Sequence, residues 1–426
     1  MALVVDGLYL VAAIVSAPVW LTRRVVAGKA KTDWPARLGR TAPLPRPTRP
    51  RLLFHAVSVG EVNAIRGLVE RLADSFDIVI ACTTDTGLAR AQALFGSRHA
   101  LVRYPLDFSR CVSRFLDAVR PDVVALVELE VWPNFTRQCE QRAIALVVVN
   151  GRLSARSYPR YRRFRPIIRP SFARLDLIIA QDETIAKRFI DLGAQPQCVH
   201  VVGTMKWDNA LEGRAGAEEG AMRLAALLVI DRARPLVVAG STGPGEEQLV
   251  RSALPPGVQL IVAPRKPERF DETARILAPC VRRSAVEKGE RSAGRYLLDT
   301  IGELRAAYAL ADLVIVGRTF SNQRGSDMME PIALGKATIV GPDVANFESV
   351  ARALIEGGGL VQVSAAQLPQ TVARLLGDAS ERAAIAERGL AVIRAHQGTI
   401  EAHAALIVQL VNGRGNSMPS GLGAVA

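Results

Sequence analysis

Short apolar runs rich in β-branched residues alternate with helix-patterned stretches along most of the chain. In the first half these runs predict strands over residues 52–57, 78–83, 123–129, 144–149 and 177–180. Runs that are apolar on both faces are typical of parallel strands covered by helices on both sides. The pattern therefore predicts an α/β fold built on a parallel sheet.

A second series of strand-like runs follows after a pause in the pattern. Residues 211–221 are rich in Gly, Ala and Glu, and we interpret them as the boundary between two domains. Further strands are predicted over 236–240, 260–263, 297–298, 313–316, 338–340 and 360–363. Two such series predict facing Rossmann-like domains, over 45–210 and 222–411, with a cleft between them. Residues 412–426 have little apolar periodicity and predict a loose tail.

The N-terminal residues 1–31 predict a membrane anchor with a basic flank. Residues 2–21 are apolar except for Asp6. Four cations follow at once: Arg23, Arg24, Lys29 and Lys31. A secretory signal carries its positive charge before the apolar stretch, so this segment does not match one. Its length fits a shallow or tilted anchor as well as a true crossing, with the flank in the cytoplasm. The alternative is a first helix buried against the protein. Because the strand pattern begins only at Arg51, we expect the fold not to depend on this segment.

Composition and charge narrow the classes of function. With 49% hydrophobic and 22% charged residues, the chain has the composition of a folded protein. Its net charge of +13 requires anionic surroundings, which nucleic acid, anionic lipid or an acidic substrate would supply. We find no recognised nucleic-acid-binding motif in the sequence. Its five cysteines and five histidines lack metal-site spacing, so we expect no metal and a reducing compartment.

Acidic residues follow two of the predicted strands. Functional groups of a doubly wound sheet lie beyond the carboxyl ends of its strands. Glu61 begins a helix after the glycine turn of HAVSVGEV, where an acidic residue also simply favours the helix dipole. In ELEVWPN, an extended backbone would place Glu128 and Glu130 on the same side. Such a pair binds hydroxyls or cations, or shares a raised pKa suited to base chemistry. The alternative is a strand end that faces solvent.

Cations and a small-residue loop follow other strands. The cations are Arg152 and Arg156 in NGRLSARS, Lys206 in GTMKWD and Arg265 in PRKPERF. Guanidinium groups suit carboxylate and phosphate oxygens, although surface solvation explains any one of them alone. GSTGPGEE, with Ser241 and Thr242, predicts a strand, loop and helix start whose N–H groups hold a phosphate. Glu330 opens another predicted helix and is suited to bind ribose hydroxyls.

Together these motifs resemble the family of 3-deoxy-D-manno-oct-2-ulosonic acid (Kdo) transferases over nearly the whole chain. Besides the apolar N-terminus, the ordered segments are HAVSVGEV, TTDTG, ELEVWPN, NGRLSARS, GTMKWD, GSTGPGEE, PRKPERF, MEPIALGK and GPDVANF. The resemblance implies a GT-B fold and an inverting transfer of Kdo from CMP-Kdo to the lipid A precursor, lipid IVA, in lipopolysaccharide core biosynthesis. It also implies no cofactor, no bound metal, no nucleic-acid partner, and a location at the cytoplasmic face of the inner membrane.

The resemblance assigns roles to particular residues. Glu61 becomes the general base, and the family's second essential glutamate maps to the ELE triplet, where we favour Glu130 over Glu128. The donor pocket is implied to comprise Ser241, Thr242, Arg265, Lys206, Glu330 and Asn346. Among these, Arg265 faces the donor's phosphate or carboxylate, Lys206 supports the leaving phosphate and Glu330 holds the ribose. Arg152 and Arg156 are assigned to the acceptor or another anion.

The chain departs from the family pattern on the donor side. It has Gly243, Lys266 and Ser326 where the family usually has histidine, and Asp327 where the family has asparagine. The chief alternative is therefore a GT-B transferase or epimerase that uses another sugar nucleotide, which failure to bind CMP-Kdo would favour. A basic protein that binds nucleic acid or a membrane is the alternative from another class.

Overall fold

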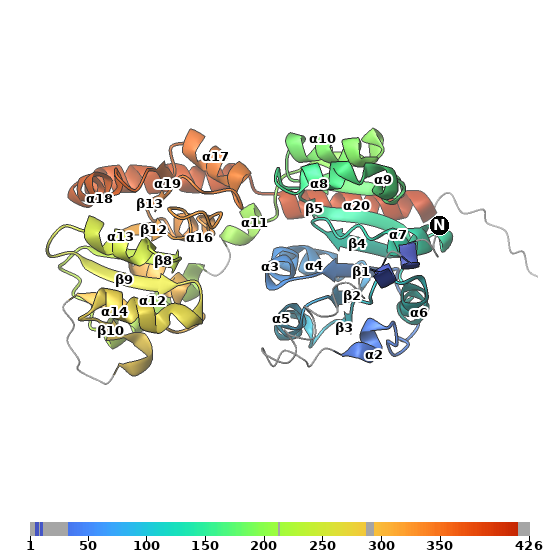
Figure 1. The fold of residues 1–426 in the computed structure, drawn as a ribbon, viewed down its shortest axis with the longest axis horizontal. Coiled ribbons are helices and arrows are strands. Elements are labelled where there is room, and N and C mark those ends of the chain that lie inside the picture. The colour runs from blue at the N-terminus through green and yellow to red at the C-terminus, as the bar shows by residue number, and fades with distance from the viewer. Residues whose placement is uncertain (1–4, 8, 12–32, 212–213, 287–293, 416–426) are drawn as a thin grey trace, which may run out of the picture. The chain divides into compact units, whose positions relative to one another are not determined.

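The computed structural model describes residues 5–7, 9–11, 33–211, 214–286 and 294–415 (Figure 1). Most of the expected anchor and residues 416–426 of the expected tail lie outside these ranges. Within them, no helix is both long and apolar enough to cross a bilayer. The chain divides into two compact units. The first unit is Met1–Lys206 with Gly398–Ala426, and the second is Trp207–Gln397.

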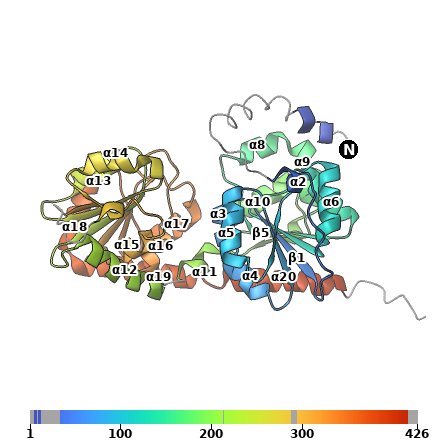
Figure 2. The ribbon, with the colours of Figure 1, turned by 90° about the horizontal axis from the view of Figure 1, so that it is seen from below.

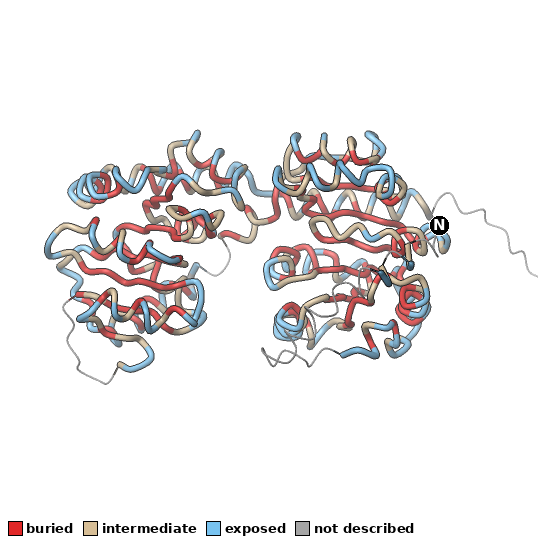
Figure 3. Tube along the Cα trace, viewed as in Figure 1, coloured by how far each residue is buried: buried red, intermediate tan, exposed pale blue. Residues whose placement is uncertain are grey.

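The first unit is built on a sheet of seven parallel strands in the order β3-β2-β1-β4-β5-β6-β7. They are β1 (Arg51–Ala56), β2 (Asp77–Cys82), β3 (Ala100–Arg103), β4 (Val123–Val127), β5 (Ala145–Gly151), β6 (Leu177–Ala180) and β7 (Val199–Val201). The central strands are buried along their whole length (Figure 3), as their mostly apolar sequences predict. The strand order reverses between β1 and β4, which makes this the switch point of the sheet.

Helices cover both faces of the first sheet (Figure 2). One face carries α3 (Val59–Ala64), α4 (Arg66–Leu72), α5 (Asp85–Phe95) and α20 (Thr399–Gly415). The other carries α6 (Ser109–Val119), α7 (Pro133–Gln141), α9 (Arg165–Ala173) and α10 (Glu183–Leu192). Two shorter helices are α2 (Trp34–Arg37), before β1, and α8 (Tyr158–Arg163), before α9.

The C-terminal helix α20 belongs to the first unit, although the chain reaches it only after the second. Ala404 and Ile407 are buried in the core of the first sheet. His403 is also buried, and its Nε2 accepts a hydrogen bond from the Asn150 N–H at 3.2 Å. The structure thus differs from the expected second domain, which ended at residue 411, and from the expected tail, because α20 runs to Gly415.

The second unit repeats the architecture, with parallel strands in the order β10-β11-β9-β8-β12-β13-β14. They are β8 (Leu236–Thr242), β9 (Gln259–Pro264), β10 (Val281–Arg282), β11 (Arg295–Leu297), β12 (Leu313–Val316), β13 (Thr338–Val340) and β14 (Val361–Gln362). One face is covered by α11 (Lys206–Ala210), α12 (Arg214–Leu228), α15 (Leu304–Leu310), α16 (Met329–Ala333) and α17 (Glu348–Glu356). The other is covered by α13 (Glu246–Ala253), α14 (Phe270–Leu277) and α18 (Leu368–Gly377), and α19 (Ala379–Ala395) contributes to both cores.

The stretch interpreted as a domain boundary differs in the structure, because most of it is helix. α12 covers residues 214–228 and packs against α15. Its buried positions Ala217, Ala221, Leu224 and Leu228 recur at helical spacing. The Gly, Ala and Glu content marks a helix with a narrow apolar face, and the second unit begins earlier, at Trp207.

Candidate active site

The acidic candidates of the first unit lie at its switch point. Glu61 is carried by α3, directly after β1. Glu128 and Glu130 follow β4, the neighbour of β1 in the sheet. Because both strands are parallel, their carboxyl ends lie at the same edge, where α/β sheets bind their ligands.

Glu61 takes part in the capping of α3 and also has a raised pKa. Ser58 caps α3 by accepting a hydrogen bond from the Glu61 N–H at 3.4 Å. The Glu61 carboxylate accepts from the Val57 N–H at 2.6 Å and from the Ser58 hydroxyl at 3.0 Å. Burial of the carboxylate raises the pKa of Glu61 to about 7, opposed by these hydrogen bonds and reinforced by the charges of Glu128 and Glu130. A carboxylate with this pKa is suited to take a proton near neutral pH.

The expected geometry of the ELE triplet is wrong, because the strand ends before it. β4 stops at Val127, and Glu128 has a left-handed backbone with φ +60°, so strand alternation does not apply. The Glu128 N–H instead donates to the Val149 carbonyl at 3.0 Å, which fixes the turn against β5.

Glu128 and Glu130 nevertheless both raise the pKa of Glu61. Trp132 donates its indole N–H to Glu130 at 2.8 Å. Burial, together with the charge of Glu128, raises the pKa of Glu130. Because both carboxylates also raise the pKa of Glu61, all three gather at the switch point.

Of the two arginines expected on this side, the structure brings one to the acids. Nη1 of Arg152 lies 3.9 Å from the Glu128 carboxylate. Arg156 is exposed in the following turn. His55, also in the first motif, is fully buried and stacks on Tyr104 at 3.4 Å. Burial lowers the pKa of His55 to about 3, so it stays neutral and is not a competing base.

In the second unit, Glu246 connects the loops that follow β8 and β12. This fully buried carboxylate accepts hydrogen bonds from the N–H groups of Gly243 at 2.8 Å and Phe320 at 2.9 Å, and from the Ser321 hydroxyl at 3.1 Å. The Arg318 N–H donates to it as well. The expectation that the loop amides hold a phosphate is thus corrected at Gly243, whose N–H is already engaged by Glu246.

The next residue, Glu247, forms an ion pair with Arg269, one of the cations of this region. Glu247 is fully buried and accepts from the Thr242 hydroxyl at 2.8 Å. Arg269 binds the same carboxylate through two nitrogens, at 2.5 and 3.1 Å. This bidentate pair holds the loop after β9 to the start of α13.

A cationic pocket of about 820 Å³ opens beside these loops. It is lined by Thr242, Gly243, Pro244, Arg265, Lys266, Glu268, Arg269, Arg318 and Gln323. Since Arg269 is paired with Glu247, the cations that suit a bound anion are Arg265, Lys266 and Arg318. Arg318 and Gln323 were missed by the sequence analysis. Arg318 lies two residues after β12, so the rule of looking at strand ends would have found it.

Only two of the six expected donor residues, Thr242 and Arg265, line this pocket. Ser241 is the penultimate residue of β8 and has a left-handed backbone, φ +57°. Asn346 donates its N–H to the Arg324 carbonyl at 2.8 Å. Lys206 is the last residue of the first unit before Trp207. Glu330 begins α16, where burial, and then the charge of Asp327, raises its pKa to about 7.

The positions that depart from the family pattern have distinct environments. Gly243 and Lys266 line the pocket, Ser326 is buried and Asp327 is exposed. A Cβ atom at Gly243 would lie 2.6 Å from the Gln323 amide nitrogen. Any side chain at this position would therefore need Gln323 to move, so the two residues share one space.

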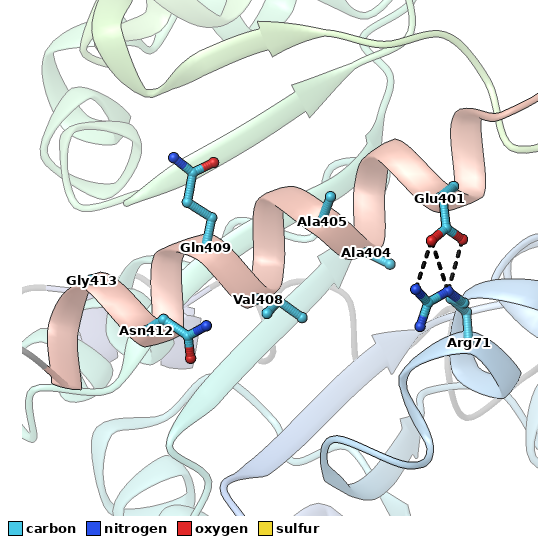
Figure 4. Close-up of a pocket in the computed structure, with 8 residues that line it drawn as sticks. All are labelled: Arg71, Glu401, Ala404, Ala405, Val408, Gln409, Asn412 and Gly413. Carbon is cyan, nitrogen blue, oxygen red and sulfur yellow. Dashed lines mark hydrogen bonds and ion pairs between the residues drawn. The ribbon is translucent and has the colours of Figure 1, made fainter.

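A second hollow, of about 580 Å³, runs along α20 (Figure 4). Its charged groups, Arg71 and Glu401, bind each other through two nitrogens of the guanidinium. The other lining residues are small or uncharged. It lies along a helix rather than at a strand end, so we do not assign it to the site. Over the ranges that the structure describes, no group of three His, Cys, Asp or Glu side chains is placed to hold a metal.

Two Rossmann-like units in one chain, each with polar groups at the carboxyl ends of its strands, define a GT-B protein. UDP-GlcNAc 2-epimerase from Neisseria meningitidis has the same fold, with a TM-score of 0.58 at 12% identity over 85% of this chain and 100% of its own. The C-terminal CMP-Kdo binding domain of WaaA from Acinetobacter baumannii aligns with 42% of this chain and 98% of its own, at 28% identity and a TM-score of 0.40.

The sequence identifies the family. The profile of 3-deoxy-D-manno-octulosonic-acid transferase (kdotransferase) matches residues 32–209. The 3-deoxy-D-manno-octulosonic acid transferase of Bordetella pertussis is 33% identical over 89% of this chain and 92% of its own length. That of Haemophilus influenzae is 30% identical over 82% and 84%. The chain belongs to the Kdo transferase family.

Proposed function

We propose that the protein transfers Kdo from CMP-Kdo to the lipid A precursor, lipid IVA, with inversion and without a metal ion. The observation that carries the proposal is the buried Glu61 carboxylate, with its pKa raised to about 7, at the switch point of the first sheet. Membership of the Kdo transferase family supports the choice of sugar.

In the proposed reaction, ionised Glu61 accepts the proton of the acceptor hydroxyl. The hydroxyl oxygen forms a bond to the anomeric carbon of Kdo, while the bond from that carbon to the CMP phosphate breaks on the opposite side. CMP leaves with the electron pair. Cations stabilise the charge that develops on the phosphate, and Arg265, Lys266 and Arg318 of the cationic pocket are suited to that role.

The basic and apolar face of α8 and α9 supports a place at the inner membrane's cytoplasmic surface. Its exposed cations are Arg160, Arg162, Arg163, Arg165 and Arg169. Between them, Phe164 is 51% and Ile167 is 54% exposed. Cations attract anionic lipid headgroups, and apolar side chains of this size insert at the headgroup boundary. We assign this face to the lipid surface from which the acceptor is taken.

The test is a transfer assay with purified full-length protein, CMP-Kdo and lipid IVA in detergent, read by mass spectrometry with and without EDTA. We expect the acceptor to gain one or more Kdo residues in both conditions. No product with CMP-Kdo, but turnover of a uridine sugar nucleotide, would favour the alternative GT-B transferase or epimerase. Loss of activity in EDTA that added metal restores would refute the metal-free reaction.

The base assignment is tested by Glu61→Gln in the same assay. Glutamine keeps the shape of the side chain and one of its two acceptor oxygens but does not take a proton, so turnover should fall about 10²-fold or more. The melting temperature and CMP-Kdo binding should stay close to wild type. Near wild-type turnover at saturating substrates would move the base role to Glu128 or Glu130.

A further inference from the structure

The described N-terminal residues are tied to the first unit by a group of polar side chains, which we call the Asp107 cluster. It consists of Asp6, Tyr9, Asp107, Ser109 and Asn134. The Asp6 carboxylate accepts from the Ser109 N–H at 3.0 Å and from the Asn134 side-chain amide at 2.8 Å. The Tyr9 hydroxyl donates to Asp107 at 2.9 Å, and its ring lies edge-on to Phe108. The segment expected to be dispensable for the fold is thus bonded to it.

The Asp107 cluster fixes the start of α7. This helix has no side-chain cap of its own, since Trp132 stands at its N-cap position. Asp107 takes the role from a distance, accepting from the N–H groups of Asn134 at 3.0 Å and Phe135 at 2.8 Å. The Asn134 amide also donates to the Asp107 carbonyl at 2.6 Å. Asp6 therefore binds Asn134, and Tyr9 binds Asp107, the two residues that fix the start of α7.

The start of α7 in turn limits where Glu130 lies. α7 begins at Pro133, directly after Trp132, whose indole binds the Glu130 carboxylate. At its other end the same short turn is fixed to β5 by the Glu128 N–H. A shift of the helix start therefore moves Trp132, and with it Glu130, relative to Glu61.

We propose that Asp6 and Tyr9 are positioning residues for Glu130, acting through Asp107 and Asn134. The N-terminal end of the chain is on this account part of the catalytic architecture. The inference rests on the proposed transfer reaction for its kinetic consequence, while the structural link stands on the hydrogen bonds alone.

The test compares the double variant Asp6→Ala with Tyr9→Phe, in the full chain, with wild type in the detergent transfer assay. We expect kcat to fall about tenfold, less than the roughly 10²-fold that misplacement by 1 Å can cost. The donor KM should stay within about twofold, since the cationic pocket belongs to the other unit. A variant with Asp6→Asn in place of Asp6→Ala keeps an acceptor oxygen, so it should regain most of the lost kcat.

Hydrogen exchange supplies a readout that does not depend on activity. In the double variant the amides of residues 129–137 should exchange faster, while those of β5 stay unchanged. Glu140→Ala is the matched control, because it removes the 2.7 Å bond from Arg174 at the other end of α7. Unchanged kcat in the double variant, or an equal loss in Glu140→Ala, would overturn the proposal. If residues 129–137 exchange faster in the double variant but the wild-type protein transfers no Kdo, the proposed function is refuted and the structural link from Asp6 and Tyr9 to α7 stands.

Discussion

At the scale of single residues, the protonation state of Glu61 depends on its neighbours. Burial and the charges of Glu128 and Glu130 favour the neutral acid, whereas hydrogen bonds from Val57 and Ser58 favour the carboxylate. The net effect is a pKa raised to about 7. A base is active only when ionised, so turnover should rise with pH through about 7.

Removing a charge next to Glu61 should shift the pH range over which turnover rises, which is the acidic limb of the pH profile. In Glu128→Gln one of the charges that oppose ionisation of Glu61 is lost, so the pKa of Glu61 falls and the acidic limb of kcat/KM shifts to lower pH. Glu61 itself remains, so the rate on the plateau should change only a few-fold. Rate measurements from pH 5 to 9 test this. A limb that stays in place would mean that Glu61 is not the titrating base.

Sequence reasoning found these residues but not their geometry. Glu61 and Glu130 follow runs that are mostly apolar, and the pattern reveals such runs directly. The left-handed turn at Glu128 depends on its N–H bond to β5, a tertiary contact that no local pattern contains. Asp107 was missed for the same reason, because its partners at Asn134 are 27 positions away.

At the scale of elements, the short loops after β8, β9 and β12 form the cationic pocket. Arg265 follows β9, and its N–H donates to the Thr242 carbonyl at 3.0 Å, which places the loop beside β8. Its side chain is exposed and lines the pocket.

Arg265→Ala should weaken use of the donor. A charge-assisted contact to an anion contributes roughly 1.5–3 kcal/mol, so the KM for CMP-Kdo should rise about tenfold or more. Arg275→Ala, an exposed position on α14 outside the pocket, is the matched control. Donor titrations of the two variants decide the matter, and equal KM values would remove Arg265 from the site.

The elements that the pattern missed are β3, β7 and β10. β3 and β7 are the two edges of the first sheet, and β10 is one edge of the second. An edge strand is short and buries less of its surface, so it lacks the continuous apolar run that marks a central strand. β7 shows this in its sequence Val-His-Val, of which His200 and Val201 are exposed.

At the scale of the whole molecule, the net charge of +13 is concentrated in part on α8 and α9. α8 has no buried residue and exposes three arginines in six positions. Cations grouped on an exposed helix attract anionic groups.

Replacing Arg160, Arg162 and Arg163 together by alanine should weaken binding to vesicles. Each cation near an anionic surface contributes about 1 kcal/mol, so affinity for phosphatidylglycerol vesicles should fall about 10²-fold, with little change for phosphatidylcholine. The triple variant Arg223→Ala, Arg275→Ala and Arg352→Ala, at exposed positions of the second unit, controls for the same loss of net charge. Co-sedimentation with vesicles measures the binding of the test variant and of its control. If the test variant instead loses binding to duplex DNA and keeps vesicle binding, the nucleic-acid alternative gains.

The division into two units was predictable, but its boundaries were not. Two series of apolar strands predicted two sheets, and both exist. The return of α20 to the first sheet could not be predicted, because a helical sequence pattern does not show which of two cores the helix will cover. Its contacts with Asn150 and the first sheet arise only in the folded chain.

The first unit is thus made of two separate stretches of the chain, and the second unit is an insertion between them. A fragment that stops before Thr399 would remove the cover of Ala404 and Ile407 from the half of the protein that carries Glu61, and would leave the Asn150 N–H without His403. Residues 207–397, by contrast, are one uninterrupted stretch that can be excised at two cuts. A carboxypeptidase would remove α20 first, and with it the cover of the core beside Glu61, before it reached the cationic pocket of the second unit.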